Sequence, residues 1–144
     1  MTRTNDDTPD LQPPDLRPLS TDAAIEQRIN DLIGRAAARQ MWLIFLNDGD
    51  LQLPLMIPID QLPSRPNDDH SVDVMGNVRD LMQQIRATSL VVVFERWGAR
   101  EMNAADIAWS RSIADACLKV ALPLRAMLLS HRNGVRWIAP DDYR

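Results

Sequence analysis

Residues 90–121 constrain the fold more than any other part of the chain. The segment opens with LVVVF, a run of β-forming residues at positions 90–94, and continues through a polar stretch at 95–102. Apolar residues then recur at three- and four-residue spacing from Asn103 to about Ala121, which predicts a helix. A buried strand that leads through a loop into a long helix is a common setting for a functional site. The loop at 95–102 is therefore the first candidate region.

The same reasoning divides the rest of the chain into helices and strands. Turn chemistry at Asn47-Asp48-Gly49-Asp50 and at Asn133-Gly134 predicts two β-hairpins. Pro54 and Pro58 place the second strand at a sheet edge. The order of elements predicts an α/β (α+β) domain, in which one mixed sheet is flanked by helices in three layers. The expected helices are 21–39, 72–86 and 103–121, and the expected strands are 41–46, 51–59, 90–94, 124–129 and 135–138.

The first twenty residues differ from the remainder. Four prolines and four aspartates occur there, so the segment cannot bury enough surface to offset the entropy of ordering it. We expect residues 1–20 to form a flexible acidic arm and residues 21–144 to form a single domain. A docking peptide built on Leu11, Leu16 and Leu19 is the alternative interpretation of the arm.

Charge and composition limit the classes of function. The 144 residues carry a net charge of −4, which disfavours binding to nucleic acid or to an anionic membrane. No apolar run reaches the roughly 18 residues that span a bilayer. The N-terminus lacks the pattern of a signal peptide, and a lone cysteine cannot form an internal disulfide. We therefore expect a cytoplasmic protein. Fifteen of the sixteen basic residues are arginine, a bias typical of a GC-rich, bacterial-type genome.

The helix at 103–116, sequence NAADIAWSRSIADA, resembles the RadC-like branch of the JAB/MPN fold, which has a cytidine-deaminase-like architecture. In that family a capping Ser precedes an Asp-Ile pair by three residues, and a Thr-Arg pair, an aliphatic residue and an Ala follow. The strand at 87–93, the stretch 122–124 and the hairpin at Asn133-Gly134 also resemble the family's flanking segments. The resemblance covers residues 41–143.

What this resemblance implies about function depends on the residues in which the chain differs from the family pattern. Active members bind zinc through a His-x-His-Pro-Ser-Gly loop and a later Asp, and an upstream Glu acts as general base. In this chain Glu95 and Trp97 stand at the positions of the two histidines, and of the ligands only Asp106 is left. Trp97 cannot ligate a metal. The family's Asp-His pair is missing from 124–129, and His131 is not placed beside Asp106. The resemblance thus implies a degenerate member without zinc, without a cofactor and without catalytic residues.

Three functions remain as hypotheses. The first is a non-catalytic pseudoenzyme that binds an unknown protein partner or a small ligand. The second is a metal-dependent hydrolase in which Glu95 and Asp106 hold Mg²⁺ or Mn²⁺. The third is a homodimer that pairs strand 51–59, although the prolines of that strand argue against extended pairing. For the first hypothesis the recognition groove would be formed by Glu95, Arg96, Trp97, Arg100, Asp106 and Ser110.

The remaining reactive and aromatic side chains are assigned structural roles. Cys117 lies on an apolar stripe and is expected to be an inert core thiol. His70 is interpreted as a solvated loop residue. Trp42, Trp109 and Trp137 are assigned to the core.

Overall fold

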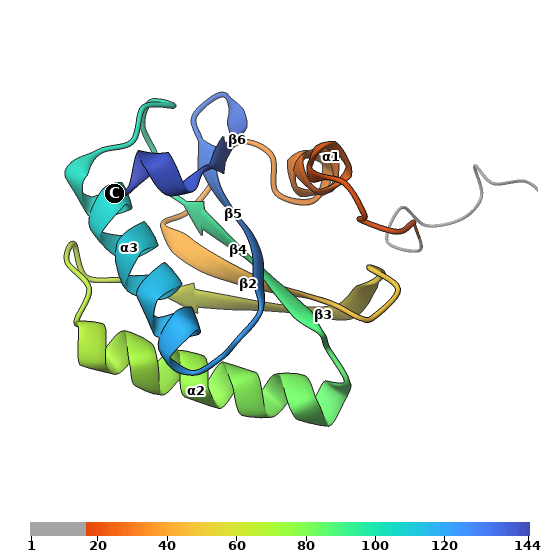
Figure 1. The fold of residues 1–144 in the computed structure, drawn as a ribbon. Coiled ribbons are helices and arrows are strands. Elements are labelled where there is room, and N and C mark those ends of the chain that lie inside the picture. Colours follow the sequence, from red (N-terminus) through yellow and green to blue (C-terminus); the bar gives the residue numbers. More distant parts are fainter. Residues whose placement is uncertain (1–16) are drawn as a thin grey trace, which may run out of the picture.

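A computed structural model describes residues 17–144 (Figure 1). The predicted docking residues Leu11 and Leu16, and most of the predicted arm, lie outside the described residues. The elements run in the order α1 (Asp22–Leu32), β2 (Gln40–Leu46), β3 (Gln52–Asp60), α2 (Asp68–Ile85), β4 (Ser89–Glu95), α3 (Ala104–Lys119), β5 (Leu124–His131), β6 (Gly134–Ile138) and the short 3₁₀ helix η3 (Pro140–Asp142).

The strands form one mixed sheet in the order β3-β2-β4-β5-β6. Both predicted hairpins are present, because β2 pairs antiparallel with β3 and β5 pairs antiparallel with β6. Strand β4 pairs antiparallel with β2 and parallel with β5. As the prolines of β3 predict, that strand lies at an edge. The parallel pair is joined through α3, so the loop before α3 lies at the carboxyl end of the central strand.

Helices cover both faces of the sheet, which confirms the predicted three layers (Figure 1). Helices α2 and α3 pack together on one face over a cluster that includes Leu43, Val92 and Leu129. Helix α1 packs on the other face, where Ile25 and Ile29 are fully buried. Alternate residues of β4 serve the two clusters, so this strand is buried on both sides. Burial on both sides is the reason that the sequence of β4 is a continuous apolar run.

Two helix boundaries differ from the prediction. Helix α1 ends at Leu32 and not near Arg39, because Gly34 adopts a φ of +61° and the chain turns away. Helix α2 begins at Asp68, four residues earlier than predicted, because the Asn67 side chain accepts from the backbone N–H of His70 at 3.0 Å. His70 therefore lies in the first turn of α2, and its assignment to a loop was wrong.

The start of the domain and the turn of the first hairpin show details that the sequence did not indicate. Leu19 is 2% exposed, and its backbone N–H donates to the Asp50 carbonyl at 2.7 Å, so the ordered domain includes residues before 21. In the turn between β2 and β3 the positive φ of 59° belongs to Asp50, not to Gly49. Aspartate tolerates this conformation better than most residues.

The aromatic assignments hold only in part. Trp109 is buried in the core between α3 and the sheet, and its indole N–H donates to the Pro63 carbonyl at 2.9 Å. Trp42 and Trp137 are partly buried at the margin of the cluster beneath α1. None of the helices within residues 17–144 is long and apolar enough to cross a membrane.

Candidate functional site

The site lies where β4 ends and α3 begins. The Asn103 side chain accepts from the Asp106 backbone N–H at 2.8 Å, and the Asp106 carboxylate accepts from the Asn103 N–H at 2.9 Å. This reciprocal capping box satisfies two backbone donors at the start of α3 and places a carboxylate against the positive end of the helix dipole. Asparagine at the cap and aspartate three residues later are thus the local cause of the helix start.

Arg96 binds the same carboxylate. Its Nε lies 3.1 Å and 3.2 Å from the two oxygens of Asp106, and one terminal nitrogen lies 2.6 Å from Oδ2. The guanidinium also donates to the carbonyls of Ala99 at 2.6 Å and Glu101 at 2.9 Å. The two side chains are 12% and 7% exposed, so the pair is largely shielded from water. Arg96 therefore ties the loop back onto the first turn of α3.

Backbone hydrogen bonds fix the other side of the loop. The Arg96 N–H donates to the Ser130 carbonyl at 3.2 Å, and the Arg132 N–H donates to the Gly98 carbonyl at 2.9 Å. Gly98 has a φ of +115°, which favours glycine at this position. Trp97 lies between these two hydrogen-bonded residues, and 64% of its surface is exposed. The loop is held at both ends while its aromatic side chain faces solvent.

Glu95 has a different environment from Asp106. Its carboxylate accepts from the backbone N–H groups of Ala37 at 2.6 Å and Ala38 at 2.9 Å. It also accepts from the side chains of Gln40 and Trp42, both at 2.9 Å. Glu95 lies on the same face of β4 as Val91 and Val93, which belong to the cluster beneath α1. Its hydrogen bonds therefore join the end of β4 to the segment that leads into β2.

These contacts set the ionisation of Glu95. Burial raises the pKa of this carboxyl, but the hydrogen bonds from Ala37, Trp42, Gln40 and Ala38 outweigh burial and hold the pKa below its ordinary value of 4.5. Glu95 is thus a carboxylate at neutral pH, and its oxygens are occupied by four donors. A group so engaged is poorly placed to abstract a proton or to bind a cation.

A small hollow adjoins the two carboxylates. It has a volume of about 70 Å³ and is lined by residues that include Arg39, Phe94, Asn103 and Asp106. Pockets for drug-sized ligands enclose roughly 300–1,000 Å³. The hollow is therefore too small for an organic substrate.

The six residues predicted to line a groove divide into exposed and buried members. Trp97 and Arg100 are exposed, and Arg96 and Asp106 lie together beneath them. Ser110 is 0% exposed and its hydroxyl is enclosed between α3 and the sheet, so it does not reach the surface. Glu95 is 4% exposed and is turned toward Ala37. A single groove through all six side chains is thus not formed, and the accessible part is the tip of the loop.

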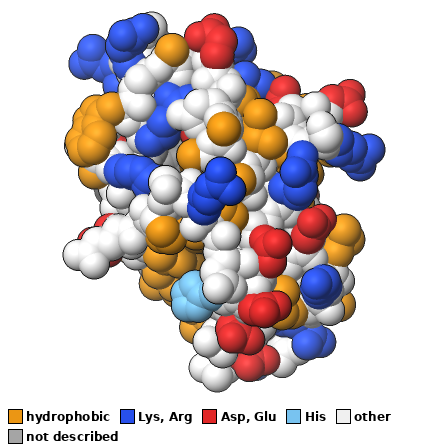
Figure 2. Space-filling model, turned by 90° about the vertical axis from the view of Figure 1, so that its left-hand side faces the viewer, with side chains coloured by type: hydrophobic (Ala, Val, Ile, Leu, Met, Phe, Trp, Pro, Cys, Tyr) orange, Lys and Arg blue, Asp and Glu red, His pale blue; other side chains and the backbone are white. Residues whose placement is uncertain are grey.

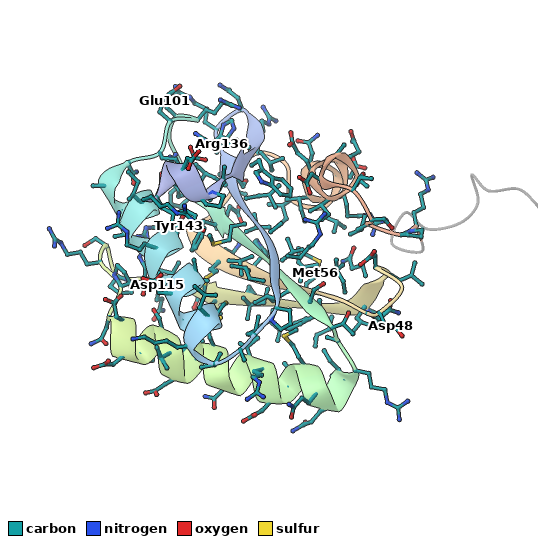
Figure 3. The ribbon with its side chains drawn as sticks, viewed as in Figure 1. Asp48, Met56, Glu101, Asp115, Arg136 and Tyr143 are labelled. Atoms are coloured by element: carbon teal, nitrogen blue, oxygen red, sulfur yellow. The ribbon has the colours of Figure 1, made fainter. Side chains whose placement is uncertain are left out.

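His131 was not recognised as part of this region from the sequence. It ends β5, is 4% exposed, and its Nδ1 accepts from the Asn133 N–H at 3.2 Å. Burial lowers the pKa of the imidazole, and Arg100, Arg96 and Arg136 lower it further, whereas Glu101 acts in the opposite direction. His131 is therefore neutral at pH 7. The three arginines thus act on the imidazole more strongly than Glu101 does. Figure 3 shows Glu101 and Arg136 at the same end of the molecule.

Metal-binding side chains do not converge within residues 17–144. No three His, Cys, Asp or Glu residues of this range are close enough to share an ion. Asp106 is already bound to a guanidinium, and Glu95 is bound to four donors. The geometry therefore gives no support to a hydrolase in which these two carboxylates hold Mg²⁺ or Mn²⁺. Cys117 is buried, and burial raises the pKa of its thiol to about 12, as an inert core cysteine requires.

No protein-family model matches the chain, and no curated protein sequence matches it.

Proposed function

We propose that the chain is a non-catalytic binding module that recognises a partner through the loop at 96–101. The observation that carries the proposal is the combination of an exposed Trp97 with a loop fixed by Arg96. A loop whose backbone is already fixed in the free protein loses little conformational entropy on binding. Tryptophan and arginine are also the residues most enriched in binding hot spots.

The state of the carboxylates supports the same conclusion. In a catalytic site, carboxylates face a space into which a substrate or a metal-bound water enters. Here Asp106 is used to hold Arg96 and to cap α3, and Glu95 is used to anchor residues 37–42. Both groups stabilise the scaffold that presents the loop. A degenerate RadC-like domain, as the resemblance implies, remains our proposal for the origin of this scaffold, and the hairpin–helix–strand–loop–helix order supports it.

Replacing Trp97 with alanine is expected to abolish partner binding and to leave the fold intact. The side chain is 64% exposed, so the free energy of unfolding should change by less than about 0.5 kcal/mol. Binding should fall at least tenfold, since a central aromatic hot spot contributes about 2 kcal/mol or more. The measurement is quantitative affinity capture from the source cells with the full chain as bait, combined with urea unfolding.

Leu118→Ala is the matched control for this experiment. Leu118 is 80% exposed but lies near the end of α3, away from the loop. Its variant should capture the same partners as the unaltered chain. Equal capture by the Trp97 variant and the unaltered chain would contradict the proposed surface.

A metal titration separates the binding module from a metal-dependent hydrolase. Adding Mg²⁺, Mn²⁺ or Zn²⁺ at tenfold molar excess to the untagged chain should shift the melting temperature by less than a degree. A ligand that binds only the folded state would raise it by several degrees. A shift of that size, lost in Asp106→Ala, would restore the hydrolase hypothesis.

A further inference from the structure

Three exposed arginines gather at the end of the molecule that carries the Trp97 loop. Arg35 follows α1, and its neighbour Ala36 donates to the His131 carbonyl at 2.9 Å. Arg132 lies beside His131 and its backbone N–H donates to Gly98. Arg100 belongs to the loop itself and acts electrostatically on His131. Among the hydrogen bonds and ion pairs of the described chain, the guanidinium groups of Arg35, Arg100 and Arg132 take no part.

Most acids at this end are already paired. Asp106 is bound to Arg96 at 2.6 Å, and Asp142 is bound to Arg136 at 2.9 Å. Glu95 is enclosed by its four donors. Among the acids of the described loop at 95–102 and of η3, Glu101 and Asp141 form no ion pair. Around His131, the arginines Arg100, Arg96 and Arg136 act more strongly on the imidazole than Glu101 does. Among these residues the three unpaired arginines exceed the two unpaired acids, although the whole chain carries a net charge of −4.

The opposite sign prevails on the adjoining face. Helix α2 contains four aspartates and one arginine, and in Figure 2 carboxylates gather in the lower part of the face while arginines are frequent in its upper part. A long polyanion laid across this side would meet repulsion beyond the arginines. A short anionic segment would contact the arginines without reaching the region of repulsion. The charge pattern therefore favours an acidic peptide over a nucleic acid.

We infer that the partner of the Trp97 loop is an acidic peptide segment, whose carboxylates pair with Arg35, Arg100 and Arg132 and whose apolar side chain covers Trp97. The inference rests on the proposed function and specifies the chemistry of its partner. Guanidinium groups bind carboxylates through paired hydrogen bonds. The exposed indole supplies the apolar contact that a purely electrostatic surface would lack.

The test measures binding of a fluorescent eight-residue peptide of alternating glutamate and leucine to the full chain. A glutamine counterpart of the peptide and a 20-nucleotide single-stranded DNA are measured at the same ionic strength. We expect the glutamate peptide to bind at least tenfold more tightly than the other two probes. Affinity should fall as salt is raised from 50 to 500 mM, because exposed ion pairs are screened. No detectable binding at 1 mM peptide, equal binding of the glutamine peptide, or tighter binding of DNA would overturn the inference.

Charge reversal locates the peptide on the surface. The double variant Arg100→Glu/Arg132→Glu should weaken peptide binding at least tenfold. The control Arg65→Glu/Arg79→Glu reverses two exposed arginines elsewhere in the chain and should weaken it less than twofold. Equal losses in the two variants would contradict the site.

The same variants separate this inference from the proposed function. If affinity capture is lost with Trp97→Ala but survives Arg100→Glu/Arg132→Glu, the loop binds a partner and the acidic chemistry is wrong. If Trp97→Ala leaves capture unchanged, the proposed function itself fails.

Discussion

Glu95→Ala is expected to lower the free energy of unfolding by about 3–5 kcal/mol, because several donors to a buried carboxylate lose their acceptor at once. The substitution removes the acceptor of four donors, namely the N–H groups of Ala37 and Ala38 and the side chains of Gln40 and Trp42. Each buried donor left without a partner costs about 1–3 kcal/mol, and entry of water reduces the sum. Urea unfolding followed by circular dichroism measures the change.

Two further variants test whether the loss of stability comes from the carboxylate of Glu95. Glu95→Gln keeps one carbonyl oxygen but presents an NH₂ group to the remaining donors, so its loss should be intermediate. Glu101→Ala removes an exposed acid from the same loop and should change stability by less than about 0.5 kcal/mol. A loss below 1 kcal/mol for Glu95→Ala would show that the carboxylate does not hold residues 37–42 in place.

The contribution of Glu95 should also depend on pH in a defined direction. Its pKa in the folded protein lies below the ordinary value of 4.5, so the unfolded state binds the proton more readily. The stabilisation is fully present above the unfolded pKa and is lost as the pH falls through the folded pKa. The stability difference between the unaltered chain and Glu95→Gln should therefore be constant from pH 7 to about 5 and then shrink. A difference that grows on acidification would contradict the assignment.

Arg96→Met is expected to cost about 2–4 kcal/mol, because it leaves the Asp106 carboxylate, 7% exposed, without its cation. The hydrogen bond from Asn103 and the helix dipole keep the cost below that of a fully isolated charge. In a double-mutant cycle with Asp106→Asn, the coupling energy should lie between about 1 and 3 kcal/mol. Arg100→Met, which removes an exposed arginine of the same loop, is the control and should be nearly neutral. Additive losses in the cycle would contradict a direct pair.

Arg96 also has a functional consequence that stability alone does not reveal. The variant retains Trp97, but the loop loses the donors to the Ala99 and Glu101 carbonyls. Partner affinity should fall although the contact residue is present, because the loop must be ordered on binding. Faster hydrogen exchange confined to residues 97–101 would identify this cause. Unchanged exchange with lost binding would instead place Arg96 in the contact surface.

The sequence predicted the local part of this site well. Asn103 was correctly predicted as the start of the helix, and the structure adds that its side chain forms a capping box with Asp106. The apolar run at 90–94 correctly predicted a buried strand, and the structure shows that this strand is buried on both faces. Such features depend on neighbours in the chain, which is why periodicity and capping rules can find them.

Contacts between distant segments could not be predicted in this way. The donors to Glu95 lie 53–58 residues earlier in the chain, and no local pattern links them to it. Ser110 was predicted to line the groove together with Asp106, one helical turn away, whereas tertiary packing buries the serine completely. His131 lies at the site only because β4 pairs in parallel with β5. Each of these features was not predicted because it depends on tertiary packing between residues that are distant in the sequence.

The two prolines of β3 have a consequence for synthesis of the chain. The β2–β3 hairpin emerges from the ribosome before α2 and β4, so both of its edges lack a neighbouring strand until β4 follows. Pro54 and Pro58 offer no backbone N–H, which makes the β3 edge a poor template for pairing with neighbouring nascent chains. Strand β2 has no such protection, and its open edge is the place that β4 later fills. The order of synthesis thus leaves a single aggregation-prone edge, and completion of the sheet removes it.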